Sequence, residues 1–247
     1  MTPAKQLPDI PEVITDQKAF CTNCNCHHSI PRAPAAHAAM KLMARMDKEL
    51  KTSYLYGEAL GKMFGILLCR SRTGKLVTLK AFSGQYNGNW ELKGWVPPLF
   101  NVSAFQQLSF PMEKKIKSLG KMAASLPPDS EKYKALLKQR KLLSQQLMRD
   151  IHALYTLHNF RGEQRSLTRF FPKGRGIPTG TGDCCAPKLL NHAAIHNLHP
   201  LALVEFYWGM ANKSATKHEG HLYQACEEKC GPLLGYLLCG SKELSAP

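Results

Sequence analysis

The first strong periodic pattern lies between residues 33 and 52, where apolar side chains recur at helical spacing. Ala36, Met40, Met43 and Leu50 fall on one face, and the segment holds few helix breakers. The pattern predicts an amphipathic helix that packs one side on a core.

Two short apolar runs come next, over residues 63–69 and 76–82, with a polar stretch that contains Gly74 between them. Runs of this length around a glycine predict the two strands of a β-hairpin. The segment 85–101 that follows is dense in glycine, proline and aromatic residues, which indicates an ordered loop.

Residues 111–170 form long lysine-rich segments in which apolar residues are mostly three, four or seven positions apart. The pair Pro127–Pro128 interrupts the first half, and proline cannot continue a helix. We therefore predict a helical hairpin inserted into the chain. Its second half carries Leu136, Leu143, Leu147, Ile151 and Leu154.

The last third of the chain predicts a helix, a strand and a second helix. Residues 184–198 can form a helix because Pro187 falls in its first turn. Residues 200–209, PLALVEFYWG, are almost continuously apolar, which is typical of a strand buried on both faces. A short closing helix is expected to carry Cys226 and Cys230.

Taken in order, these elements predict an α/β protein with one core and one insertion. Residues 33–110 and 171–247 would form the core, and residues 111–170 the inserted helical arm. Residues 1–32, rich in proline and polar side chains, are predicted to be a flexible lead-in.

Charge changes the view of the arm. Lysine and arginine outnumber aspartate and glutamate by 33 to 18 over the whole chain, a formal net charge of +15, which favours polyanionic partners. Met112 to Phe170 hold 13 basic against 5 acidic residues. The arm is therefore a candidate RNA-binding surface, with a solvated coiled-coil face as the alternative. The candidate contacts are Lys114, Lys115, Lys117, Lys138, Arg140 and Lys141.

The sequence favours an intracellular, cytoplasmic protein without a membrane partner. It holds no run of about 18 apolar residues, and residues 1–17 lack the basic-then-apolar order of a secretory signal. The nine cysteines are mostly clustered, and in a reducing compartment such clusters indicate metal or reactive thiols. Cys69 and Cys239 stand alone in apolar runs and are expected to be buried as small hydrophobic residues.

Cys184, Cys226 and Cys230 are the first candidate zinc ligands. The order helix, strand, strand, helix, strand, helix is that of the zinc-dependent nucleobase deaminase core, a three-layer cytidine-deaminase-like sheet with flanking helices. There, thiolates at two neighbouring helix N-termini hold zinc and leave one position for water. The alternative is that these cysteines pack in the core or form a surface pair.

A deaminase also needs a carboxylate that moves protons, two residues after the first ligand. That position is Ala186 here, so Asp183 and Glu205 are the candidate substitutes. His218, His221 and Trp208 are expected to line the same site.

The segment FCTNCNCHH is a second candidate metal site. Cys21, Cys24, Cys26 and His27, with His28 beside them, provide enough soft ligands for a zinc knuckle. A closed site usually draws its other ligands from further along the chain, and the alternative is a flexible segment that binds metal adventitiously.

Long motifs in residues 60–240 resemble the N-terminal extension of a subset of large RluA-type RNA pseudouridine synthases. The similar segments include KLVTLKAFSG, GWVPP, GTGDCCAPKLL, LVEFYWG and the closing CEEKC. In this resemblance Cys184, Glu205, Trp208, Cys226 and Cys230 match family positions, and Cys185 is a local variant. Nothing similar to the synthase domain follows Gly240, so synthase catalysis is not expected from this chain, which would be either a fragment or a stand-alone relative.

Together these features predict a zinc-binding, deaminase-like module of RNA modification, associated with a pseudouridine synthase and binding tRNA or rRNA through the basic arm. The alternatives are an active zinc-dependent cytosine or adenine deaminase and a non-enzymatic scaffold with structural zinc. A toxin deaminase is a further possibility, since such enzymes also carry an AFSG hairpin.

Overall fold

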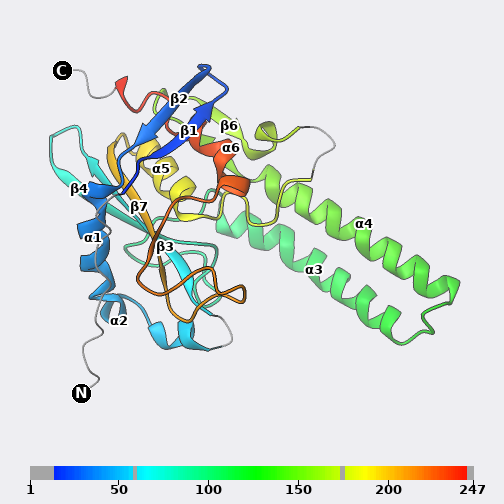
Figure 1. Cartoon of the computed structure of the whole chain (residues 1–247). Coiled ribbons are helices and arrows are strands. Elements are labelled where there is room, and N and C mark those ends of the chain that lie inside the picture. The colour runs from blue at the N-terminus through cyan, green and yellow to red at the C-terminus, as the bar shows by residue number, and fades with distance from the viewer. Residues whose placement is uncertain (1–13, 58–59, 173–175, 244–247) are drawn as a thin grey trace.

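A four-stranded antiparallel sheet forms the centre of the molecule (Figure 1). The computed structural model describes residues 14–57, 60–172 and 176–243. The strand order is β4-β3-β7-β8. The bounds are Lys62–Arg70 for β3, Leu76–Phe82 for β4, His199–Trp208 for β7 and Leu222–Tyr223 for β8.

The predicted hairpin and buried strand are confirmed. β3 pairs with β4 from Phe64 opposite Phe82 to Arg70 opposite Leu76, and with β7 along its whole length. β7 lies in the interior of the sheet and is buried along almost all of its length, as its continuous apolar run predicts.

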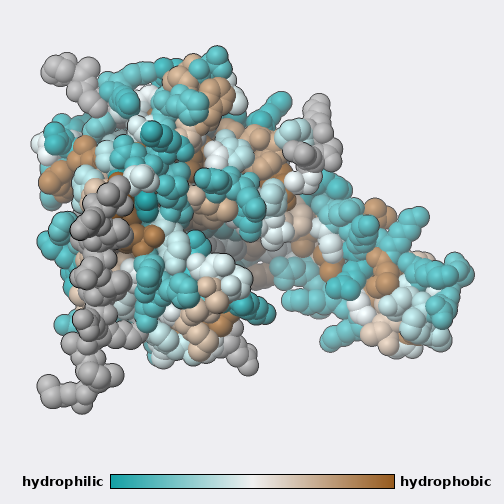
Figure 2. All heavy atoms as spheres, viewed as in Figure 1, coloured by the Kyte–Doolittle hydropathy of each residue, from teal (hydrophilic) through white to brown (hydrophobic). Residues whose placement is uncertain are grey.

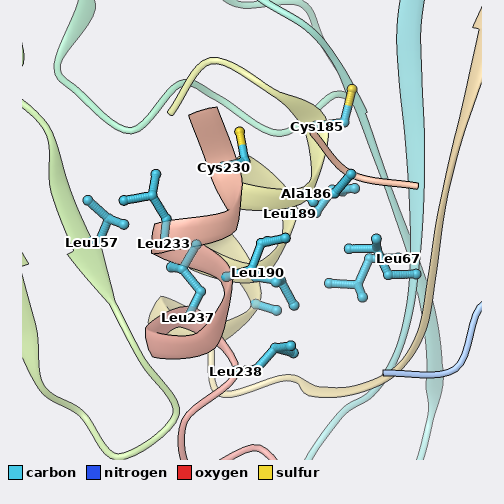
Figure 3. Close-up of a cluster of buried hydrophobic side chains, with 14 of the residues drawn as sticks. Leu67, Leu157, Cys185, Ala186, Leu189, Leu190, Cys230, Leu233, Leu237 and Leu238 are labelled. Carbon is cyan, nitrogen blue, oxygen red and sulfur yellow. The ribbon is translucent and has the colours of Figure 1, made fainter. Parts of the chain in front are cut away.

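Helices cover both faces of the sheet. On one face lie α1 (Ala33–Met43), α2 (Met46–Glu49) and the 3-10 turn η1 (Thr52–Tyr56), packed on Phe64, Val204 and Phe206. On the other face lie α5 (Cys185–Ile195) and α6 (Glu227–Leu237). Figure 3 shows their leucines interlocking in the core, with Leu189 and Leu190 from α5 and Leu233 and Leu237 from α6. This confirms a mixed α/β protein, in which helices pack on an antiparallel sheet.

The basic arm is an antiparallel helix pair that projects from the body of the protein (Figure 1). It consists of α3 (Val102–Ala124) and α4 (Glu131–Ala153). The side chains of Asn101 and Ser130 cap the two helices by accepting hydrogen bonds from backbone N–H groups of their first turns. The helix pair thus begins before the predicted start at 111.

Residues that follow α4 return to the core. β5 (Thr156–His158) pairs with β6 (Gln164–Ser166), and the 3-10 turn η2 (Leu167–Phe170) comes next. Leu157 and Leu167 are fully buried in the cluster under α5 and α6. The arm therefore ends at Ala153, and residues 156–170 form part of the layer that covers the core.

The predicted flexible lead-in is wrong for the residues that are described. β1 (Gln17–Cys21) and β2 (Cys26–Ile30) form an antiparallel hairpin, with Cys21 opposite Cys26. This hairpin lies against α6, and the backbones approach so closely that a Cβ atom on Gly235 would lie 2.0 Å from the carbonyl oxygen of Phe20. Residues 1–13 lie outside the described residues. None of the helices in the described part of the chain is long and apolar enough to cross a membrane.

Candidate metal centre

Three cysteines and one histidine converge where the β1–β2 hairpin meets the end of α6. The ligand atoms of Cys21, Cys24, His28 and Cys239 all lie within 4.8 Å of one another, and theirs is the one such group of three or more ligands among the described residues. Cys21 and Cys239 are buried, whereas Cys24 and His28 are half-buried. This cluster could hold a metal ion such as zinc.

The hairpin supplies three of the four ligands through its turn. Cys21 ends β1, Cys24 lies in the turn, and His28 lies in β2. Asn25 adopts a left-handed conformation with φ of 55°, which asparagine tolerates better than most residues. The tight turn brings Cys24 back over the strand pair, so that its Sγ lies 3.1 Å from His28 Nε2.

The fourth ligand comes from the far end of the chain. Cys239 lies just beyond α6, where its backbone N–H donates to Tyr236 O and its carbonyl accepts from Phe160 N–H. Its Sγ is 3.8 Å from Cys24 Sγ. Two thiolates on a tetrahedral zinc with Zn–S bonds of about 2.3 Å are themselves about 3.8 Å apart. Four protein ligands would leave no open position, which is the pattern of a structural site.

The chemical state of the ligands follows from their burial. Burial, and then hydrogen bonding to Cys24, raises the pKa of the Cys239 thiol to about 12. Burial lowers the pKa of His28, helped by the nearby Arg161 and Lys242, and this favours the neutral imidazole that binds metals.

Of the ligands predicted for the second metal site, Cys21 and Cys24 lie in this cluster, whereas Cys26 and His27 lie outside it. Successive residues of a strand point to opposite faces, so His28 points to the cluster, whereas His27 packs its ring 5.1 Å from that of Phe20. Cys26 is exposed and lies outside the group, although its Sγ is 3.1 Å from that of Cys24.

Cys239 was missed because its apolar surroundings indicate only a packing role. Burial is confirmed, at 0% exposure, but the thiol also faces the hairpin. The number of ligands could have pointed to Cys239. A four-ligand site with three ligands in the N-terminal segment needs a fourth from elsewhere, and Cys69 and Cys239 were the two isolated cysteines that had no predicted metal role.

The other predicted zinc ligands meet only in part. Cys184 is the N-cap of α5, and Cys230 belongs to α6. Interaction with the nearby Cys184 thiol, and then burial, raise the pKa of Cys230. Among the described residues, Cys184, Cys226 and Cys230 do not form a group of three whose ligand atoms all lie within 4.8 Å of one another. Cys226 is the N-cap of α6 with extended backbone angles, so the spacing of four residues does not align the two side chains as it would inside a helix.

Both candidate proton-shuttling carboxylates already have structural partners. Glu205 is 3% exposed on β7, and its Oε1 accepts a hydrogen bond of 2.7 Å from the N–H of Ala186 at the start of α5. Burial raises the pKa of Glu205 to about 7. Asp183 accepts a 2.7 Å hydrogen bond from the hydroxyl of Tyr155, and burial raises its pKa.

The residues expected to line this site do not all lie on the side of the sheet where Glu205 points. His218 and His221 lie in the loop before β8, with ring centroids 5.9 Å apart. Trp208 packs in the cluster on the α1 face, whereas Glu205 three positions earlier contacts α5. Because side chains alternate along a strand, Trp208 does not line a site that contains Glu205.

Cys185 is a packing residue. It is fully buried, and its thiol donates to the carbonyl oxygens of Met63, at 3.4 Å, and Ala81, at 3.7 Å. The second cysteine of the pair thus anchors α5 on β3 and β4.

The Glu205 carboxyl predicts a pH dependence of stability. Its pKa is about 7 in the folded protein against an ordinary 4.5, so the unfolded chain loses this proton first and the protein loses stability as the pH rises from 4.5 to 7. Glu205→Gln cannot ionise and removes this loss. At pH 8 we expect the variant to gain about 2 to 3 kcal/mol relative to the wild type beyond any difference at pH 5, measured by urea unfolding.

Glu228→Gln is the matched control, because Glu228 is exposed on α6. It should follow the wild-type pH profile. A Glu205→Gln profile that also follows the wild type would contradict the buried, proton-retaining carboxyl.

Comparison with known proteins gives no family for this chain: no protein-family model matches it, and no curated protein and no solved structure is significantly similar.

Proposed function

We propose that this chain is a zinc-binding, deaminase-like module of RNA modification that binds RNA through the helix pair α3–α4. The observation that carries the proposal is the projecting basic arm. Residues 102–153 hold ten lysines and arginines against four aspartates and glutamates. A phosphate backbone attracts such a surface regardless of base sequence.

The charged side chains of the arm are available to a partner. Lys114, Lys115, Lys117, Lys138, Arg140 and Lys141 are all exposed. The face of the arm seen in Figure 2 is mainly hydrophilic, with some apolar side chains among the polar ones. A purely solvated helix pair would need no such excess of one sign, because like charges close together destabilise the helices that carry them.

Two features support the deaminase-like part of the proposal. The helices α5 and α6 are preceded by the N-caps Cys184 and Cys226, and the start of α5 is hydrogen-bonded to the interior strand β7, in the order expected for that core. In the sheet, strand β7 lies next to β3 of the β3–β4 hairpin, which is also the order expected for that core. A pseudouridine synthase domain is the proposed partner, on the strength of the sequence resemblance.

The proposed zinc is structural, held by Cys21, Cys24, His28 and Cys239. In this role it fastens the β1–β2 hairpin to the end of α6. It lies between the β1–β2 hairpin and the end of α6 rather than on the arm, so RNA binding would use other residues.

A second candidate function is hydrolytic deamination at Cys184, Cys226 and Cys230. The neighbouring thiols of Cys184 and Cys230, near enough to the buried carboxyl of Glu205 for it to raise the pKa of Cys230, favour it. It requires a second zinc per chain that is lost in Cys184→Ala, and release of ammonia from RNA or nucleosides. One zinc, retained in Cys184→Ala, without turnover would exclude it.

The arm predicts a specific defect in RNA binding. The triple variant Lys114→Ala, Lys115→Ala, Lys138→Ala should bind tRNA or a duplex RNA about 10- to 100-fold more weakly at low salt. It should also reduce the slope of log affinity against log salt by about 2 to 3, because each lost phosphate contact no longer releases its counterion. Fluorescence anisotropy over a salt series measures both quantities.

The control variant removes three positive charges from the surface of the protein outside the arm. Lys41, Lys48 and Lys93 are exposed outside the arm, and replacing all three by alanine should leave the salt slope nearly unchanged. Equal losses in the two triple variants would show a non-specific charge effect, and wild-type protein that binds no RNA would overturn the proposed function.

A further inference from the structure

A groove runs along the base of the arm, where α4 rejoins the core. Its volume is about 760 Å³, within the range of about 300 to 1,000 Å³ that is usual for small-molecule sites. One face of α4 forms one wall, and Thr168, Phe171, Pro172, Gly176 and Ile177 line the other. The principal lining residues are Lys141, Gln145, Met148, Arg149, His152 and Phe171.

The inner part of the groove is apolar and aromatic. Met148 and Phe171 are half-buried, and Phe171 packs against the core cluster under α5 and α6. His152, in the last turn of α4, is 5% exposed. A phenylalanine ring held by the core on one side offers a rigid surface for a flat ligand, because little side-chain freedom remains to be lost on binding.

The rim of the groove is cationic. Lys141 and Arg149 lie about two turns apart on the same face of α4 and are both exposed. Arg149 donates to Oε1 of Gln146 at 2.6 Å, so its partner there is a neutral amide. None of the described lining residues is acidic. A ligand that fits this groove therefore combines negative charge at the rim with a flat apolar body.

We propose that this groove binds an unpaired nucleotide of RNA, with the base stacked on Phe171 and the flanking phosphates near Lys141 and Arg149. The side chains of Gln145 and Thr168 line the same groove and can hydrogen-bond the edges of a base. The inference rests on the proposed RNA binding of the arm and adds the kind of RNA that is bound. Lys138 and Lys141 lie one turn apart on α4, so the basic surface of the arm continues to the rim of the groove. A protein helix docked in the same groove would not supply the phosphate groups that its cationic rim favours.

Stacking distinguishes this groove from the general charge of the arm. Base stacking on an aromatic side chain changes affinity by about 5- to 100-fold, whereas blunt duplex RNA keeps its bases inside the helix. Phe171→Leu keeps an apolar side chain of similar size and removes the ring. It should weaken binding of a fluorescein-labelled single-stranded hexauridine by about 5- to 100-fold and leave binding of a blunt duplex within twofold of the wild type.

Phe110→Leu is the matched control, because Phe110 is 59% exposed on the other helix of the arm. It should leave hexauridine binding unchanged. The groove inference is overturned if Phe171→Leu binds hexauridine like the wild type, or if Phe110→Leu loses as much affinity. If the wild type binds neither RNA, the proposed function itself fails.

Photo-crosslinking gives a readout that does not depend on the folding of a variant. RNA that carries 5-iodouridine in a single-stranded segment should crosslink to wild-type Met148, His152 or Phe171, identified by mass spectrometry. Crosslinks confined to α3 or to the tip of the arm would place the base elsewhere and would contradict the groove.

Discussion

Replacing Cys239 by alanine is expected to abolish stoichiometric zinc binding and to lower the free energy of unfolding by about 3 to 5 kcal/mol. Cys239 is the ligand that joins the end of α6 to the β1–β2 hairpin, and the other three ligands all belong to that hairpin. Without the Cys239 thiolate, zinc would have ligands only in the hairpin and would no longer link the hairpin to α6. Thermal and urea unfolding, with zinc measured on the same samples, check this result.

Cys69→Ala is the matched control for a buried cysteine. Cys69 and Cys239 are both 0% exposed, but Cys69 lies in β3, outside the metal cluster. Its loss should leave a small cavity, cost about 1 kcal/mol and retain the zinc. If the two variants are equally stable and both retain zinc, Cys239 is only a packing residue.

Gly235→Ala is expected to be the second severe change, with a loss of about 3 kcal/mol or more. An added Cβ would lie 2.0 Å from the carbonyl oxygen and 2.4 Å from the carbonyl carbon of Phe20, and 2.7 Å from the backbone nitrogen of Cys21. These are backbone atoms, which cannot turn away as a side chain can, so β1 must move off α6. Because β1 carries Cys21, the affinity for zinc should fall as well, which a competition titration with a chelator measures.

Gly120 provides the comparison, in the interior of helix α3. A Cβ there would make only ordinary contacts, with the side chain of Arg140 at 3.6 Å or more, and alanine favours a helix over glycine by up to about 1 kcal/mol. Gly120→Ala should therefore be neutral or stabilising. A Gly235→Ala protein as stable as Gly120→Ala would contradict the close packing of β1 on α6.

The elements that the sequence predicted correctly are those with a strong local pattern. The run PLALVEFYWG becomes β7, and the paired apolar runs around Gly74 become β3 and β4. Each of these segments buries or half-buries most of its side chains, so its apolar pattern alone indicates a strand in the sheet. The Pro127–Pro128 break likewise falls in the turn between α3 and α4.

The β1–β2 hairpin could not be predicted in this way, because its two five-residue strands are short and partly polar. It is stabilised by tertiary packing on α6, which no local pattern of residues 17–30 records. The same tertiary contact brings Cys239 to Cys24 across 215 positions of the chain.

The individual ligands depended on conformational details that spacing alone does not give. His27 and His28 are neighbours in sequence, and only the face of β2 decides which of them points to the cysteines. Similarly, Cys226 and Cys230 are four residues apart, but the first is an extended N-cap and not part of the helix. The sequence therefore identified the ligand types and not the complete ligand set.

X-ray absorption at the zinc edge of the purified wild-type protein tests the proposed metal centre most directly. The account predicts one zinc per chain, with three sulfur ligands at about 2.3 Å and one nitrogen ligand at about 2.0 Å. Four sulfur ligands would place Cys26 in the site instead of His28, and a protein without bound zinc, or with zinc bound mainly by oxygen, would contradict the metal centre itself.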